Sequence, residues 1–138
     1  MKKSIENIVH HSEVSEKEIE KYLVKQVRAM GGICLKYSNA NMVGYPDRVA
    51  ILPFGVTVWV ELKSRGKKPT KIQVLRHEEL KDLGHHVIVL DSKPKIDQMV
   101  TIWGCLIEAA RLYAGSAGSH AMDFGSSQMW IVPRHGTR

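Results

Sequence analysis

Apolar positions in the first part of the chain recur at a helical spacing. The first apolar stripe consists of Ile19, Leu23, Val27 and Met30. Side chains three to four residues apart lie on one face of a helix, so this stripe predicts an amphipathic helix. Ser15 and Glu18 have the spacing of a capping box, which predicts that the helix begins there. Gly31-Gly32 predicts its end near Met30.

Further along, short runs rich in β-branched residues predict strands, and two stretches with helical spacing predict helices. The predicted strands cover residues 33–37, 48–52, 56–63 and 86–90, and the predicted helices cover 71–83 and 94–113. Thr70 and Gln73 form a second possible capping box, and Gly84 ends the helix that follows. The order helix, three strands, helix, strand, helix predicts an α/β fold, a single mixed β-sheet flanked by α-helices.

The end of the chain differs in composition from the rest. Residues 115–119 are Gly, Ser and Ala, the composition of a linker. Residues 122–133 then contain Met, Trp, Ile and Val, which can pack on the domain or pair with another chain. The 138 residues otherwise suit one domain. We therefore expect a domain over 1–114 and a tail of open role over 115–138.

The composition narrows the cellular setting and the partners. The chain contains no apolar run near the roughly 20 residues of a membrane span, and its start shows no secretory signal. Cys34 and Cys105 match no metal-ligand spacing and are interpreted as reduced core thiols, which favours the cytoplasm. The net charge of +6 suits a polyanion such as DNA, although it is equally compatible with a role in solubility.

The strand predicted over 56–63 carries the most informative pattern. Because side chains alternate across a strand, Val56, Val58, Val60 and Leu62 face a core, and Thr57, Trp59, Glu61 and Lys63 face the other way. An acid and a lysine therefore share one face at the end of an apolar strand. The alternative is a surface salt bridge of little energetic value.

A second acid precedes the neighbouring strand, in Gly44-Tyr45-Pro46-Asp47. The strands over 48–52 and 56–63 are joined by a short turn and should pair as a hairpin, which brings Asp47 opposite Glu61 and Lys63. Two carboxylates and an ammonium suit phosphodiester hydrolysis, because hard oxygen ligands bind Mg²⁺ or Mn²⁺ and the lysine can orient water or neutralise charge.

Glu20 and Gln73 are the next candidates. Glu20 lies on the flank of the buried helical stripe, where a carboxylate needs a partner such as a metal ion. Glu16 competes with it, but the first helical turn already explains an acid at position 16. Gln73 can hold a phosphate or a water, or it can serve only in the capping box. Possible phosphate contacts are Lys36, Arg65, Lys67, Lys68 and Lys71.

Taken together, these residues resemble the PD-(D/E)XK nucleases, and specifically the VRR-NUC family. The matching positions are Gly44-x-Pro46-Asp47, Glu61-x-Lys63 and Gln73, with Glu20, Leu23, Gly31-Gly32, Lys36, Gly66-Lys67-Lys68 and Gly84 around them. The resemblance covers residues 15–91, and the small stand-alone phage and bacterial members are the most similar. It implies a restriction-endonuclease-like fold and Mg²⁺- or Mn²⁺-dependent DNA cleavage, in the host cytoplasm if a phage encodes the protein.

The resemblance also implies roles for single residues. Glu20, Asp47, Glu61 and the Leu62 carbonyl would be metal ligands, Lys63 the catalytic lysine and Gln73 an accessory residue. It further implies a homodimer that acts on branched DNA such as a Holliday junction, with the final helix or the tail at the interface. Two alternatives stay open: a DNA-binding protein without catalysis on the same fold, and a restriction-type nuclease that reads a base sequence.

Overall fold

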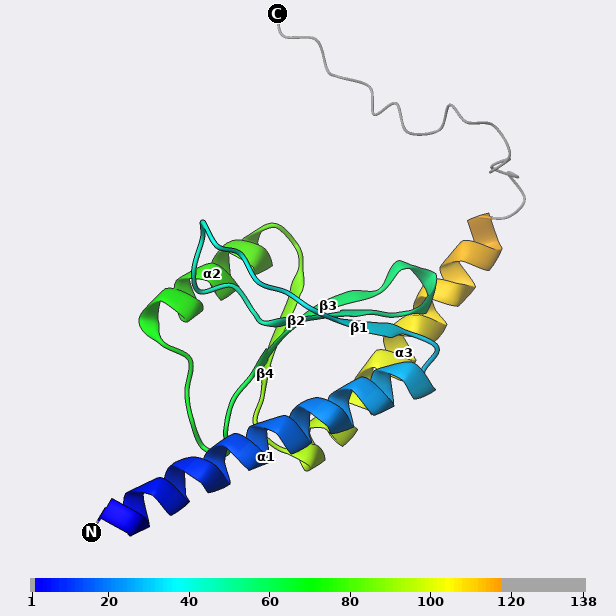
Figure 1. Ribbon diagram of the computed structural model, residues 1–138. Helices are drawn as coiled ribbons and strands as arrows, with labels where there is room; N and C mark the ends of the chain where they lie inside the picture. The colour runs from blue at the N-terminus through cyan, green and yellow to red at the C-terminus, as the bar shows by residue number, and fades with distance from the viewer. Residues whose placement is uncertain (1, 118–138) are drawn as a thin grey trace, which may run out of the picture.

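The computed structural model describes residues 2–117, the side chains of 16–116 among them. The elements are α1 (Lys2–Ala29), β1 (Ile33–Lys36), β2 (Arg48–Ile51), the 3-10 turn η1 (Pro53–Gly55), β3 (Thr57–Leu62), α2 (Lys71–Asp82), β4 (His86–Leu90) and α3 (Lys93–Ala117). This order is the predicted one, and the strand ends differ from the predicted ends by one residue at most. In Figure 1, α1 runs below the strands, α3 starts near α1 and rises along the right, and α2 lies at the upper left.

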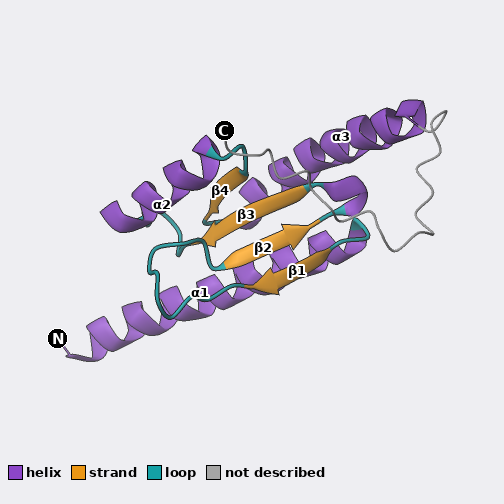
Figure 2. Ribbon diagram, turned by 90° about the horizontal axis from the view of Figure 1, so that it is seen from above, coloured by secondary structure: helices purple, strands orange, loops and turns teal. Residues whose placement is uncertain are grey.

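The four strands form one mixed sheet in the order β1-β2-β3-β4. The pairs β1–β2 and β2–β3 are antiparallel, and β3–β4 is parallel. A parallel pair requires a crossover connection, and α2 supplies it between β3 and β4. Figure 2 shows the four strands side by side, with α2 beyond the end at which β3 finishes. The predicted α/β mixed sheet flanked by helices is confirmed.

The core lies between the sheet and the pair α1 and α3. Its buried members are Ile19, Leu23, Val27, Ala50, Leu52, Val58, Val60, Leu62, Leu90, Ile96 and Trp103. Three of the four residues of the predicted stripe of α1 and three of the four predicted core-facing residues of the β3 strand are among them, while Met30 and Val56 are partly buried and pack against the core. Gly32 allows the chain to turn tightly beneath the sheet, because a Cβ there would lie 2.6 Å from the Ile51 carbonyl oxygen. The close approach of α1 and β2 thus depends on a residue without a side chain.

Three expectations from the sequence are wrong. α1 begins at Lys2, so Ser15 lies inside the helix and is not its N-cap. The segment before Ser15 contains no Gly or Pro, and the Ser-x-x-Glu spacing is equally compatible with a helix interior. α3 continues to Ala117 through residues that have linker composition. Cys105 is exposed and Cys34 is only partly buried, so neither free thiol lies in the core.

The tail predicted over 115–138 falls mostly outside the described part of the chain. Residues 118–138 lie outside it, and so does the expected contribution of the tail to an interface. Among the helices of residues 2–117, none combines the length and the apolar character needed to cross a membrane.

Candidate active site

Asp47 and Glu61 meet at the end of the β2–β3 hairpin. The register pairs Arg48 with Val60, and the next step along the antiparallel ladder sets Asp47 opposite Glu61. Asp47 Oδ1 accepts a hydrogen bond from the Leu62 backbone N–H at 3.2 Å. The fully buried Pro46 fixes the backbone before the strand. The structure therefore brings together the two carboxylates that the sequence placed on one hairpin.

Glu61 is the most buried charged group of the site, with 3% of its surface exposed. Its Oε1 forms an ion pair with Lys63 Nζ at 2.8 Å and accepts a hydrogen bond from Gln73 Nε2 at 2.5 Å. Its Oε2 is buried and has no hydrogen-bond partner among the described residues. A buried carboxylate oxygen without a partner is costly, so Oε2 is suited to bind a cation.

Gln73 fills the predicted capping box and also contacts Glu61, while its predicted contact with a phosphate or a water stays a prediction. Thr70 and Gln73 form the predicted capping box, in which the Thr70 backbone N–H donates to Gln73 Oε1 at 2.9 Å. The same side chain donates from Nε2 to Glu61. Because the backbone N–H can bind only the amide oxygen, the cap fixes which end of the amide faces the carboxylate. The start of α2 thus orients Glu61.

The electrostatics of Asp47 and Glu61 favour a positive charge between the two carboxylates. Burial raises the pKa of Asp47, and the neighbouring Glu61 raises it further, against the lowering effect of the Leu62 N–H. Two facing carboxylates with hard oxygen atoms are the donor set that Mg²⁺ or Mn²⁺ prefers. Among the side chains that the structure describes, no cluster of three or more from His, Cys, Asp or Glu is arranged for a metal. Two carboxylates are enough for an ion that keeps several waters as ligands.

Glu20 is not grouped with these carboxylates. Its Oε1 forms an ion pair with Arg48, whose side chain is 10% exposed while that of Glu20 is 40% exposed. Arg48 was missed in the sequence, although it has the same strand parity as the core residues Ala50 and Leu52. A charged residue at a core-facing position requires a partner, and that signal points to the acid of the adjacent helix.

Glu16 has a different environment from the one expected. It lies in the middle of α1, so the helix dipole of a first turn does not explain it. Its Oε2 accepts a hydrogen bond from Ser64 Oγ at 3.1 Å. Ser64 directly follows Lys63, so α1 also contacts the chain where it leaves the site.

The predicted phosphate contacts lie on chain segments that adjoin those of the two carboxylates. Lys36 ends β1, Lys71 opens α2, and Arg65, Lys67 and Lys68 lie in the loop that joins β3 to α2. All five side chains are exposed, and none forms a salt bridge within the described residues. Their positions at the chain segments next to Asp47 and Glu61 suit contacts with a polyanion.

Aromatic rings form one wall of the site, and the sequence did not single them out. Trp59 shares the sheet face of Glu61, and its ring packs edge-on against Tyr37 with centroids 5.1 Å apart. The Tyr37 N–H donates to the Asp47 carbonyl oxygen at 2.7 Å. These contacts fix the backbone of Asp47 from the β1 side. The sequence contained the signal for this contact, because Trp59 and Glu61 are two residues apart on one strand and therefore share a face of the sheet.

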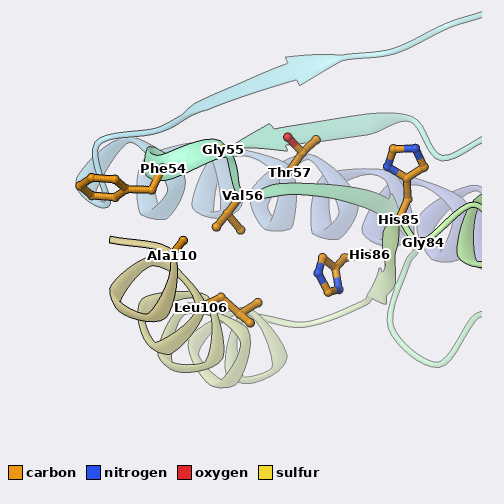
Figure 3. A pocket seen from close by; sticks show the side chains of 9 residues that line it. All are labelled: Phe54, Gly55, Val56, Thr57, Gly84, His85, His86, Leu106 and Ala110. Atoms are coloured by element: carbon orange, nitrogen blue, oxygen red, sulfur yellow. The ribbon is translucent and has the colours of Figure 1, made fainter. Parts of the chain in front are cut away.

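The cavity shown in Figure 3 lies at the opposite end of β3 and does not belong to this site. It measures about 470 Å³ and is lined by Phe54, His85, His86, Leu106 and Ala110 among others. None of the described residues that line it is acidic. His85 and His86 point in different directions (Figure 3), as expected for neighbours at the start of a strand.

Comparison with known proteins agrees with this geometry. No family model matches the chain. A protein of Acyrthosiphon pisum secondary endosymbiont phage 1, named "Putative nuclease p44", is 48% identical over 80 residues, which cover 58% of this chain and 86% of that protein. A solved structure described as "VRR_NUC domain" superposes with a TM-score of 0.61 at 33% identity, and the match covers 63% of this chain and 95% of that one.

Proposed function

The chain belongs to the VRR-NUC family of nucleases, and from that premise we propose that it is an endonuclease that hydrolyses DNA with Mg²⁺ or Mn²⁺. One observation carries the proposal. Glu61 is buried opposite Asp47, its ion pair with Lys63 and its hydrogen bond from Gln73 both use Oε1, and Oε2 is left without a partner among the described residues. A carboxylate in this state is suited to bind a metal ion.

Asp47 and Glu61 would hold the ion, and we infer the Leu62 carbonyl and Glu20 as further ligands. When bound, a divalent ion acidifies water and neutralises charge that develops on the phosphate. Arg48 engages Glu20 Oε1, so Glu20 would bind such an ion through Oε2 or after release of Arg48. Gln73 keeps Glu61 in one orientation, and so presents Oε2 rather than Oε1 to the ion.

Lys63 acts on the phosphate side of the site. Its ammonium group lies 2.8 Å from Glu61 Oε1, is partly exposed, and can bind a phosphate oxygen or orient the attacking water. The five exposed basic residues around the carboxylates would fix the DNA backbone, with Lys67 and Lys68 on one side and Lys36 on the other.

We propose branched DNA, such as a Holliday junction, as the substrate and a homodimer as the active form. The two-fold symmetry of a dimer can present two sites to a junction that has the same symmetry. The phage origin of the related protein is compatible with action in the cytoplasm of an infected cell. The two alternatives, binding without catalysis and reading of a base sequence, are outcomes of the same experiment.

Labelled linear, nicked, flapped and four-way DNAs are incubated with the full chain, with Mg²⁺, with Mn²⁺ or with excess chelator. Glu61→Gln is the matched inactive variant, because it keeps the shape of the side chain and removes its charge. We expect cleavage with either metal, none with chelator or with the variant, and a preference for branched DNA that is independent of base sequence. Cleavage that persists in chelator would contradict the metal mechanism. Binding without cleavage by the wild-type protein supports the non-catalytic alternative.

A further inference from the structure

The loop between β1 and β2 exposes two apolar side chains next to the site. Met42 is 42% exposed and Val43 is 68% exposed, and Ile72 in the first turn of α2 is 38% exposed. Gly44 brings the loop against α2, because a Cβ at this position would lie 3.0 Å from both Ile72 Cγ1 and the Ile72 carbonyl oxygen. Met42, Val43 and Ile72 therefore lie at the junction of the loop and α2, and we refer to them as the apolar ridge. Figure 1 shows this loop, in cyan, beside α2.

Polar contacts hold the loop against the helix. Arg76 donates from Nε to the Val43 carbonyl oxygen at 3.3 Å, and it forms an ion pair with Glu79 at 2.7 Å. Tyr45 donates to Glu79 at 3.4 Å, and the Arg76 guanidinium lies 5.5 Å from the centre of the Tyr45 ring. The exposure of the ridge is thus maintained by specific contacts on the inner side of the loop.

The ridge is next to both halves of the active site. Ile72 directly precedes Gln73, whose amide binds Glu61, and Asp47 follows Gly44 by three residues. A basic side chain adjoins the ridge, because Lys71 directly precedes Ile72 at the start of α2, and Lys36 ends β1 before the loop. Contiguous apolar surface surrounded by polar groups is typical of a binding site.

The chemistry of the ridge and its surroundings fits one kind of DNA surface. Phosphates are anionic and suit the basic flank, while the flat face of a base pair is apolar and suits Met, Val and Ile. Continuous duplex conceals these faces within the stack. They become accessible at a branch point, a nick or an end, where an apolar side chain can pack against the last base pair.

We propose that Met42, Val43 and Ile72 form a wedge that packs on an exposed base-pair face, and that this contact selects branched or interrupted DNA over continuous duplex. The inference rests on the proposed function, because it assigns a substrate feature to the same site. It differs from the phosphate contacts, which bind any DNA without preference for its shape.

The test compares the wild-type protein with Met42→Ser/Val43→Ser. Both side chains point to solvent and none of the contacts that hold the loop uses them, so we expect an unchanged melting temperature. Val43→Thr, which keeps the shape and adds a hydroxyl group, replaces the double variant if the latter does not fold. Leu83→Ser is the matched control, since Leu83 is 76% exposed at the other end of α2.

Binding is measured with Ca²⁺ in place of Mg²⁺, on DNA with 2-aminopurine either at the branch point or inside a duplex. The wild-type protein should raise the branch-point fluorescence. The double variant should lose this change and about tenfold in affinity for branched DNA, with linear duplex binding unchanged. Leu83→Ser should behave as wild type.

The wedge is overturned by a double variant with an unchanged ratio of branched to linear binding, by a wild-type protein without discrimination, or by the same loss in Leu83→Ser. A double variant that becomes monomeric where the wild type is dimeric assigns the ridge to a protein interface instead and also overturns it. Failure of the proposed function looks different, because the wild-type protein then cleaves none of the DNAs with either metal. An intact enzyme with an unchanged branched-to-linear ratio in the double variant rejects the wedge alone.

Discussion

Glu20→Gln separates the structural role of this glutamate from its proposed role as a metal ligand. The sequence alone predicts little change in stability, because Gln has a similar helix propensity. The structure predicts a loss, because Arg48 is 10% exposed and would remain buried without an anionic partner. Removal of one member of a fully buried pair costs about 3–5 kcal/mol, whereas a surface pair contributes about 0.2–1 kcal/mol.

Because the Glu20 side chain is 40% exposed, solvent screens the pair and an intermediate loss of about 1–2 kcal/mol is expected. This corresponds to a fall of about 3–10 °C in melting temperature for a domain of this size. Glu16→Gln is the matched control on the same helix, since its partner is the neutral Ser64 hydroxyl at 3.1 Å. It should change the melting temperature by less than Glu20→Gln does.

Thermal unfolding with and without Mg²⁺ tests the ligand role. Binding to the folded state stabilises it by about 2.7 kcal/mol at a metal concentration one hundred times the Kd. Glu20→Gln should show a smaller rise than wild type, and Glu16→Gln the wild-type rise. If Glu20→Gln keeps the full rise, Glu20 is a partner of Arg48 only. If Glu16→Gln loses the rise and Glu20→Gln keeps it, the ligand lies one helical turn earlier. An unchanged melting temperature without metal refutes the reasoning about Arg48.

Three other substitutions test the remaining groups of the site. Lys63→Ala should lower the cleavage rate at least about 100-fold while DNA binding stays nearly unchanged, and near-normal turnover would limit Lys63 to its ion pair with Glu61. It should also lower the melting temperature, because Glu61 is buried and would lose its cationic partner. Asp47→Asn should raise the melting temperature at neutral pH in chelator, because burial raises the pKa of Asp47 and its ionised form therefore opposes folding. The difference in melting temperature between variant and wild type should shrink as the pH falls and the wild-type carboxyl is protonated. A difference that does not change with pH contradicts this cause. Lys67→Ala/Lys68→Ala should reduce the slope of log affinity against log salt by about one for each phosphate that the variant no longer neutralises, whereas Lys95→Ala on α3 should leave the slope unchanged.

The strand residues were the most predictable part of the molecule. A period of two assigned Val58 and Val60 to the core and Glu61 to the opposite face, because alternation across a strand is fixed by the backbone. The short turn at Pro53–Gly55 then determined the hairpin, and the hairpin determined that Asp47 faces Glu61. These features could be predicted because they depend on local backbone geometry, and the pattern of residues in the sequence reflects that geometry.

The remaining features depend on contacts between distant segments. The partner of Glu20 is 28 residues away, and a helical angle alone cannot show whether Arg48 or a metal ion is the partner. The predicted start of α1 was wrong because a capping motif marks where a helix can begin, and a sequence free of Gly and Pro lets the helix continue beyond it. The attachment of the β1–β2 loop to Arg76 likewise depends on how α2 packs against the loop, and the spacing of apolar residues in the sequence does not predict that packing.

The hydrogen bonds of Gln73 limit where the chain can accept an insertion. Thr70, Gln73 and Glu61 are connected through a single amide, so one extra residue between 70 and 73 would rotate that amide by about 100° around α2 and away from the carboxylate. An added residue between 65 and 69 lengthens an exposed loop and leaves the helix start intact. We therefore expect that a reporter peptide or a fused recognition module is tolerated between residues 65 and 69, close to the two carboxylates, and is not tolerated between residues 70 and 73.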